Sequence, residues 1–344
     1  MSTVFVSHPR DKLDAYFGAK ATAALQTIAD VRFNPEPHEL SLAELVAAAR
    51  GCDALIAYRQ TSGPEALFRQ LPELFAFIRC AVDIRTVDVA AASAHGVLVT
   101  QASPSYVAAV AEWIVAAMID LGRGLSRYAE AYHGDLAPAP FMGRELRGST
   151  LGVIGLGRIG RHLADLALAF GMKVLAATPG PIEGGDERVR QVALAELLGA
   201  SDFVVCLAPA NVDTENLIDA AAFAAMRRGA FFVNAARGEL VDDGALLAAL
   251  DSGQLGGAAL DVGRAPDQMP AAALARHPRV IATPHIGGLT LAATEHQALE
   301  TVEQLARLLR GELPPGAVNA ADASRWRRWC ALSPSPGFAP ASAT

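Results

Sequence analysis

The fold is decided by one stretch of the sequence, Gly155-Leu156-Gly157-Arg158-Ile159-Gly160. A short strand-like run at 150–154 precedes it, and residues 161–170 follow with apolar side chains at helical spacing. Strand, glycine-rich turn and helix in this order are typical of a dinucleotide-binding unit. The glycines permit a tight turn and let backbone N–H groups approach a pyrophosphate at the positive end of the helix. The stretch therefore predicts a nucleotide site.

More strand-like runs follow this turn, each separated from the next by a helical pattern. They lie at residues 173–175, 203–206, 231–233, 258–260 and 280–282. With the run that starts at residue 151, they supply the six strands of a complete Rossmann sheet. The first hundred residues alternate in the same way, with strands expected at 4–6, 54–57, 77–80 and 97–99. We therefore expect two doubly wound parallel-sheet α/β domains.

Two long helices are expected where these series meet, at residues 106–121 and 291–309. The simplest arrangement inserts the nucleotide domain, residues 104–289, into a substrate domain made of residues 1–103 and 290–325. A cleft between two such domains is where a substrate would meet a nicotinamide. Residues 326–344 are expected to form a flexible tail, since they end in a run rich in Pro, Ser and Ala.

The composition is that of an ordinary globular protein, with 52% hydrophobic and 19% charged residues and a net charge of −7. No basic run favours nucleic acid, and no stretch is apolar enough to span a membrane or to act as a secretory signal. The four cysteines lack metal-ligand spacing, so we expect no metal site and reduced thiols in a cytoplasmic protein.

Two polar residues follow strands of the second series. Arg237 comes after the strand at 231–233, and His285 comes after the strand at 280–282. Loops beyond the carboxyl ends of parallel strands line the ligand crevice. A guanidinium can hold a carboxylate and polarise the adjacent carbonyl, and an imidazole can transfer a proton near neutral pH. Each also has a structural alternative: Arg237 as the partner of a helix end, His285 as a loop or capping residue.

With these residues in view, the sequence resembles the D-isomer-specific 2-hydroxyacid dehydrogenase family. The resemblance covers about residues 50–320 and rests on four motifs: GLGRIG at 155–160, NAARGELVD at 234–242, ALDV at 259–262 and TPHIGG at 283–288. It implies hydride transfer between NAD(P)H and a small 2-keto or 2-hydroxy acid, in a homodimer whose contact helix we expect at 106–121. It also implies a Rossmann domain inserted into a flavodoxin-like substrate domain.

The resemblance assigns roles to particular residues. Arg237 matches the family's arginine and His285 its acid–base histidine. Contacts to the cofactor are expected from the glycine-rich turn, from the ends of the later strands and from their loops: Gly155, Gly157, Arg158, Ile159, Gly160, Thr178, Pro209, Ala235, Ala236, Arg237, Asp261, His285, Gly287 and Gly288. Substrate contacts are expected from Arg59, Val82, Asp83, Arg237 and His285.

The sequence departs from the family pattern beside the histidine. Relatives pair this histidine with a glutamate, and Pro266 stands at that position here. Asp267 is adjacent and could take over as the catalytic acid, although it is one residue out of register; otherwise it is a solvated loop acid. Without a carboxylate partner, His285 should hold its proton less tightly.

Two further departures concern the cofactor and the substrate. Thr178 stands where an acid would hold the ribose hydroxyls of NAD, and no Arg or Lys follows before Arg188. We expect NAD, with NADP possible. Asp83 replaces a glycine of the turn that binds the substrate carboxylate in relatives. Either its side chain points away, to Arg85 or Arg59, or the substrate is atypical. Arg85 and Arg59 are also candidates for binding a second substrate charge; the alternative is that both are simply solvated.

Two alternatives to a common keto-acid reductase remain open from the sequence. One is a corepressor-like protein that senses NAD(H) on the same fold without turning over a substrate. The other is a dehydrogenase with an atypical substrate, which Asp83 motivates.

Overall fold

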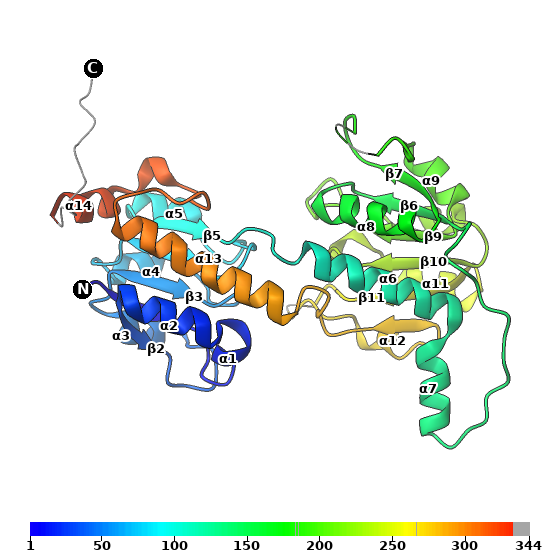
Figure 1. Ribbon diagram of the computed structural model, residues 1–344, viewed down its shortest axis with the longest axis horizontal. Helices are drawn as coiled ribbons and strands as arrows, with labels where there is room; N and C mark the ends of the chain where they lie inside the picture. The colour runs from blue at the N-terminus through cyan, green and yellow to red at the C-terminus, as the bar shows by residue number, and fades with distance from the viewer. Residues whose placement is uncertain (183, 185, 266, 333–344) are drawn as a thin grey trace. The chain divides into compact units, whose positions relative to one another are not determined.

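The computed structural model describes residues 1–182, 184, 186–265 and 267–332. The chain divides into two compact units (Figure 1). Unit 1 comprises Met1–Ser105 and Leu291–Thr344, and unit 2 comprises Tyr106–Thr290. Unit 2 is therefore inserted into unit 1 in the sequence, with boundaries close to the expected breaks at 103/104 and 289/290.

Unit 1 contains a parallel sheet with the strand order β2-β1-β3-β4-β5, which is the flavodoxin-like order. The strands are β1 (Thr3–Val6), β2 (Asp30–Phe33), β3 (Ala54–Ala57), β4 (Ala76–Arg79) and β5 (Leu98–Gln101). Side chains of β1 alternate between two cores, since Val4 and Val6 pack on one face and Phe5 on the other. Both faces are thus buried, as in other parallel sheets.

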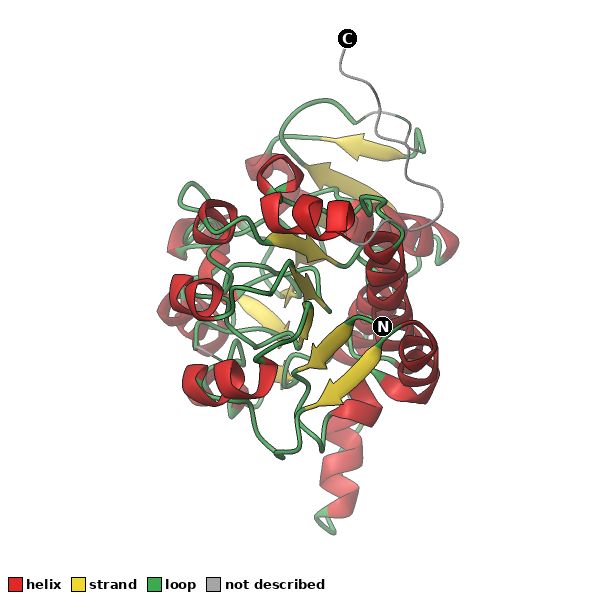
Figure 2. Ribbon diagram, turned by 90° about the vertical axis from the view of Figure 1, so that its left-hand side faces the viewer, coloured by secondary structure: helices red, strands yellow, loops and turns green. Residues whose placement is uncertain are grey.

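Helices cover the two faces of this sheet, as the red helices beside the yellow strands in Figure 2 illustrate. On the face of Val4 lie α2 (Gly18–Ile28), α13 (Leu291–Leu309) and α14 (Ser324–Leu332), with α1 (Leu13–Tyr16) packed on α13. On the face of Phe5 lie α3 (Leu42–Ala49), α4 (Glu65–Gln70) and α5 (Val89–Ala94). A short 3₁₀ turn, η2 (Ala320–Asp322), contacts β5.

Unit 2 contains a second parallel sheet, with the order β12-β11-β10-β9-β6-β7-β8. The strands are β6 (Thr150–Ile154), β7 (Lys173–Ala177), β8 (Val189–Gln191), β9 (Phe203–Cys206), β10 (Ala230–Asn234), β11 (Leu255–Leu260) and β12 (Val280–Ala282). From β8 to β11 this is the 3-2-1-4-5-6 order of the Rossmann fold, to which β12 adds one more strand. The chain reverses direction across the sheet between β6 and β9, where such folds bind nucleotides.

The helices of unit 2 lie on both faces of its sheet. One core contains α6 (Val107–Arg123) and α8 (Arg158–Ala169), and the other contains α9 (Leu194–Ala200), α10 (Ala220–Ala225), α11 (Asp243–Asp251) and α12 (Ala272–Ala275). A 3₁₀ turn, η1 (Gly238–Leu240), follows β10. In α7 (Leu125–His133), no residue is buried.

The structure confirms the expected fold class and differs from the sequence analysis in three places. The edge strands β2 and β8 were missed, because each is short and carries charged or exposed residues. The tail was placed too early, since Trp326 and Cys330 are buried in α14; residues 333–344 lie outside the described part of the chain. The apolar side chains of α6 pack within unit 2, which accounts for the pattern at 106–121 without a second chain.

Candidate functional site

The glycine-rich turn joins β6 to α8 at the carboxyl edge of the unit 2 sheet. Gly155 has a φ of 95°, and a Cβ atom there would lie 2.7 Å from the backbone nitrogen of Ala208. A Cβ at Gly160 would lie 2.6 Å from the carbonyl oxygen of Gly155. These two glycines are needed because the turn, the loop after β9 and the first turn of α8 pack backbone against backbone.

Gly157 has a different role. A Cβ at this position would have no atom within 4 Å, and the residue is exposed directly before the first turn of α8. Glycine has no side chain to cap the helix, so the first N–H groups of α8 are left for another acceptor. An open cradle over a helix N-terminus fits the pyrophosphate of a dinucleotide. Arg158 and Ile159 lie on this first turn.

The loop after β10 carries Arg237 and is held by the buried side chain of Asn234. The Asn234 Oδ1 atom accepts a hydrogen bond from the backbone N–H of Ala236 (3.1 Å), and its Nδ2 atom donates to the carbonyl of Arg237 (2.9 Å). The Nη1 atom of the half-buried Arg237 donates to the carbonyl of Ala236 at 2.7 Å. The amide of Asn234 thus fixes the backbone that presents Ala235, Ala236 and Arg237.

The loop after β12 carries His285 and is held by Asp261, which directly follows β11 and is 3% exposed. Its carboxylate accepts three hydrogen bonds from this loop: from Thr283 Oγ1 (2.6 Å), from the N–H of Ile286 (2.8 Å) and from the N–H of Gly287 (2.7 Å). A Cβ at Gly287 would lie 2.8 Å from the Asp261 Oδ2 atom, so the loop closes tightly around the carboxylate.

His285 has a left-handed backbone, with a φ of 57°, and its N–H donates to the carbonyl of Thr283 at 2.9 Å. Such a conformation is uncommon outside glycine and is kept where the surroundings over-determine it, which is frequent at functional sites. The three hydrogen bonds to Asp261 provide that constraint on both sides of the histidine.

Strand register brings these residues to one level of the sheet. Asn234 of β10 pairs with Leu260 of β11, and Leu260 pairs with Ala282 of β12. Arg237, Asp261 and His285 follow these three paired residues, so Asp261 lies on the strand between those of the other two. With about 4.8 Å between neighbouring strands, the Arg237 and His285 loops leave the sheet roughly 10 Å apart. Long side chains can span that separation.

Arg264 connects the loop after β11 to its neighbours. Its Nε atom donates to the carbonyl of Val241 at 3.0 Å, and its Nη2 atom donates to Glu239 O at 2.9 Å and to the side chain of Asn216. A Cβ at Gly238 would lie 2.1 Å from the carbonyl carbon of Gly263, so the two loops touch through backbone. No motif of the sequence pointed to Arg264, because its partners lie in other loops.

Two positions were considered for an acid partner of His285, those of Pro266 and Asp267. Pro266, at the position of the family's glutamate, lies outside the described residues. Asp267 is exposed, and its Oδ1 atom accepts a hydrogen bond from the N–H of Met269 at 3.0 Å. The carboxylate of Asp267 thus stabilises the turn that leads to Met269.

Thr178 follows β7, the strand next to the glycine-rich turn, and its carbonyl accepts a hydrogen bond from Gln191 Nε2 at 3.2 Å. Arg188, the first cation after it, is paired with Asp186 at 2.6 Å. Pro209, in the loop after β9, accepts a hydrogen bond from Thr214 Oγ1 at 2.8 Å. The described residues around Thr178 thus show neither an acid for the ribose nor an uncommitted arginine for a 2′-phosphate.

The remaining candidates lie at the carboxyl edge of the unit 1 sheet. Arg59 is half-buried after β3, while Val82 and Asp83 lie in the turn after β4. The carboxylate of Asp83 forms an ion pair with Arg85 at 2.8 Å. Asp83 thus points to Arg85, one of the two partners that the sequence suggested.

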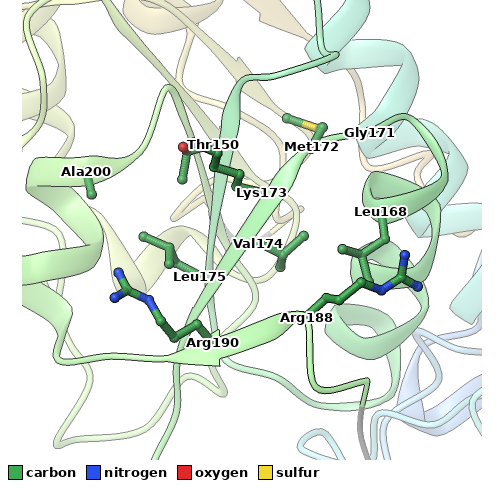
Figure 3. Close-up of a pocket in the computed structure, with 10 residues that line it drawn as sticks. All are labelled: Thr150, Leu168, Gly171, Met172, Lys173, Val174, Leu175, Arg188, Arg190 and Ala200. Atoms are coloured by element: carbon green, nitrogen blue, oxygen red, sulfur yellow. The ribbon is translucent and has the colours of Figure 1, made fainter.

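A cavity of about 510 Å³ lies elsewhere in unit 2 (Figure 3). Thr150 and Lys173, the first residues of β6 and β7, line it, so it lies at the amino end of strands whose carboxyl ends face the glycine-rich turn. Arg188 and Arg190 also line it, and each is already paired with a carboxylate, Asp186 and Glu196 respectively. This cavity is therefore not the nucleotide site.

Other classes of site were also sought. No group of three or more His, Cys, Asp or Glu side chains suited to a metal occurs in the described parts of the chain. None of the helices in these parts is both long and apolar enough to cross a membrane. All four cysteines are buried free thiols, as expected.

Comparison with known proteins gives the same class as the fold and the site. Residues 115–287 match the model of the NAD-binding domain of the D-isomer-specific 2-hydroxyacid dehydrogenases. D-3-phosphoglycerate dehydrogenase of Rattus norvegicus is 35% identical over 289 residues, which are 83% of this chain and 54% of that protein. The chain spans about half the length of the curated relatives that it matches first.

Solved structures of D-lactate dehydrogenases are also similar. The enzyme of Aquifex aeolicus, complexed with NAD and lactic acid, is 27% identical with a TM-score of 0.76. That of Treponema pallidum is 26% identical with a TM-score of 0.78. Each comparison covers 92% of this chain and 99% of the other. The chain belongs to the D-isomer-specific 2-hydroxyacid dehydrogenase family, and unit 2 contains that family's NAD-binding domain.

Proposed function

We propose that this protein is an NAD-dependent oxidoreductase that interconverts a small 2-keto acid and the corresponding D-2-hydroxy acid. The observation that carries the proposal is the arrangement at one sheet edge of unit 2. Arg237 and His285 follow β10 and β12, the two strands that flank β11, at the same carboxyl edge as the glycine-rich turn, and buried Asp261 holds the histidine loop in a left-handed conformation. Residues held in such a conformation cluster at functional sites, which supports a role for the imidazole of His285 in that site.

Arg237 and His285 have different roles toward the substrate, binding and proton transfer respectively. The guanidinium of Arg237 holds the substrate carboxylate and polarises the adjacent keto oxygen. His285, in its protonated form, donates a proton to that oxygen as the carbonyl carbon is reduced. NADH, when bound, supplies the hydride. In the reverse direction, the neutral imidazole accepts the hydroxyl proton.

NAD is the preferred cofactor in this proposal, with NADP possible. Thr178 offers no carboxylate that would repel a 2′-phosphate, and Arg188 is committed to Asp186 rather than open to that phosphate. Comparing kcat/KM for NADH and NADPH tests the preference; a higher value for NADPH would reverse it.

The substrate class is a small 2-keto acid, and the candidates in unit 1 for its recognition are Arg59 and the turn that contains Val82 and Asp83. Arg59 is the candidate for a second substrate charge, since it is a half-buried cation directly after β3 at the carboxyl edge of the unit 1 sheet. The similarity to phosphoglycerate dehydrogenases makes 3-phosphohydroxypyruvate one member of the panel below.

We also propose a homodimer in the cytoplasm. The surface that favours self-association is α7 with the loop after it, which exposes large apolar side chains: Leu125, Tyr132, Leu136, Phe141 and Met142. The buried free thiols fit a reducing compartment. Light scattering during gel filtration tests the dimer, and a monomeric mass at micromolar concentration would reject it.

The test of the main proposal is a panel of 2-keto acids with NADH and NADPH. It includes glyoxylate, pyruvate, hydroxypyruvate, 2-oxopentanoate, 2-oxoglutarate and 3-phosphohydroxypyruvate. We expect kcat/KM of at least about 10⁴ M⁻¹s⁻¹ for one of them, the low end of the usual enzyme range. NADH binding without turnover of any member would favour the sensor alternative instead.

A further inference from the structure

The turn after β4 contains a carboxylate and a guanidinium that are paired with each other, those of Asp83 and Arg85. The Asp83 Oδ1 atom accepts hydrogen bonds from the backbone N–H of Arg85 (2.9 Å) and from Arg85 Nε (3.1 Å). The Oδ2 atom accepts from Arg85 Nε (3.1 Å) and Nη2 (2.8 Å). The carboxylate of Asp83 and the guanidinium of Arg85 thus form a bidentate pair, and the carboxylate also accepts a hydrogen bond from the backbone N–H of Arg85.

Arg79, the last residue of β4, holds this turn in place through its hydrogen bonds. Arg79 is fully buried: its Nη1 atom donates to the carbonyl of Tyr58 at 2.5 Å, and its Nη2 atom donates to Thr86 Oγ1 at 2.7 Å. Burial lowers the pKa of Arg79 to about 10, so it remains a cation at neutral pH. Its contacts tie the end of β3 to the far end of the turn.

The turn is also in the right place for a ligand contact. β3 and β4 are neighbours in a parallel sheet, so the turn that carries Asp83 and Arg85 lies beside Arg59 at the carboxyl edge of unit 1. Ligands of open α/β sheets bind beyond this edge. Side chains of this turn are therefore positioned to choose among substrates.

The Asp83–Arg85 pair has the geometry with which proteins hold a carboxylate from outside. A planar guanidinium fork with an adjacent backbone N–H is a carboxylate receptor, and here a carboxylate of the same chain fills it. The carboxylate of Asp83 belongs to the same chain and lies two residues from Arg85, so it binds without the loss of translational freedom that a substrate carboxylate would undergo. The negative charge of Asp83 also repels a second anion that approaches Arg85.

From this geometry we propose that Asp83 is a specificity-determining residue: it fills the receptor of Arg85 and so excludes 2-keto acids that carry a second carboxylate. The enzyme then selects 2-keto monocarboxylates over 2-keto dicarboxylates of the same length. This inference rests on the proposed function, because it concerns the substrate of the same site. It goes beyond that function because it assigns to Asp83 the exclusion of one class of substrate and no part in the reaction itself.

The test compares 2-oxoglutarate with 2-oxopentanoate, which has the same number of carbons and lacks the second carboxylate. The measured quantity is the ratio of their kcat/KM values at saturating NADH. Asp83→Asn keeps the shape of the side chain and removes its charge, so we expect the ratio to rise about tenfold in favour of the dicarboxylate. Asp83→Ser provides a second variant if the first folds poorly.

Unit 2 offers a matched control. Asp186 and Arg188 form the same bidentate pair at the same spacing, with the Asp186 Oδ1 atom accepting from the backbone N–H of Arg188 at 2.8 Å. Asp186→Asn should leave the substrate ratio unchanged. Adding Arg85→Gln to Asp83→Asn should remove the gain, because the fork that would receive the second carboxylate is then absent.

The outcomes separate this inference from the proposed function. If wild-type protein reduces no keto acid, the function is wrong. If wild-type protein reduces 2-oxopentanoate, and neither Asp83→Asn nor Asp83→Ser shifts the ratio beyond that of Asp186→Asn, the function stands and the role of Asp83 is wrong. A gain that survives Arg85→Gln would equally overturn the inference, since Arg85 would not be the receptor.

Discussion

At the scale of single residues, the site depends most on a side chain that does not itself react. Asp261 is this side chain: its two carboxylate oxygens accept three hydrogen bonds from the loop that carries His285. The resemblance to the family implied a contact with the cofactor for this residue. Its position between the Arg237 and His285 strands adds a second task, that of fixing the histidine backbone.

Replacing Asp261 by Asn should therefore impair turnover. The NH₂ end of the Asn amide donates hydrogen bonds and cannot accept them, so one of the two buried N–H groups, that of Ile286 or that of Gly287, loses its acceptor. We expect kcat to fall about 10- to 100-fold, and the free energy of unfolding to fall by about 1–3 kcal/mol. Steady-state kinetics and urea denaturation measure the two effects; a kcat within twofold of wild type would contradict this role.

The missing glutamate gives a second prediction for a single residue. Pro266→Glu supplies a carboxylate at the family's position, and a nearby negative charge favours a protonated imidazole. We expect a higher kcat for keto-acid reduction at pH 7.5 and a pH–rate profile whose upper limb moves to higher pH. Asp267→Asn should change neither, because the Asp267 carboxylate is engaged with Met269. An upper limb unchanged by Pro266→Glu would show that another group already assists His285.

At the scale of elements, the glycines of the nucleotide turn differ in what surrounds them. Gly160→Ala places a Cβ 2.6 Å from a backbone oxygen, whereas Gly157→Ala places one in open space at a φ of −75° that alanine adopts freely. Folding and nucleotide binding can therefore be separated within one motif.

Gly157→Ala should leave the melting temperature unchanged within about 2 °C and weaken NADH binding about tenfold or more, because its methyl group enters the space meant for the pyrophosphate. Gly160→Ala should lower the melting temperature instead, since backbone atoms must move. Fluorescence titration with NADH and thermal unfolding measure both. Unimpaired NADH binding by folded Gly157→Ala would mean that the nucleotide lies elsewhere.

Features that depend on residues close together in the sequence could be predicted from it, whereas features that depend on contacts between distant residues could not. The buried strands and the helices that flank them were visible because apolar periodicity is a local property, as in α13, whose bounds agree with the prediction. The edge strand β8 was not visible, since Val189–Gln191 is short and polar. The roles of Asn234 and Arg264 were missed for another reason. Their hydrogen-bond partners lie in loops and include backbone carbonyls, and a sequence motif does not indicate such contacts.

At the scale of the whole molecule, one buried histidine links stability to pH. His8 follows β1 in unit 1, packs against Phe17 and Tyr58, and has a buried Nδ1 atom without a hydrogen-bond partner among the described residues. Burial lowers its pKa from 6.5 to about 3. Between these values the unfolded chain binds a proton that the folded protein does not, so stability falls as pH falls below about 6.5.

Replacing His8 by Phe should make unit 1 less sensitive to acid. Between pH 7.5 and 4.5, the loss in free energy of unfolding should be smaller than in wild type by about 2.7 kcal/mol, from 1.36 kcal/mol per pH unit over the roughly two units between pH 6.5 and 4.5. Urea denaturation at both pH values gives the difference. His133→Gln, a change at an exposed position on α7, is the control. An equal loss in His8→Phe and wild type would contradict the prediction.

The most direct test of the central claim is the single-turnover rate of keto-acid reduction at saturating NADH in Arg237→Gln and His285→Gln. Both variants remove a group assigned to the substrate carbonyl, so the account predicts a fall of about 10² to 10⁴ in each. A rate within tenfold of wild type in either variant would contradict the assignment of that residue, and such rates in both would contradict the proposed reaction at this site.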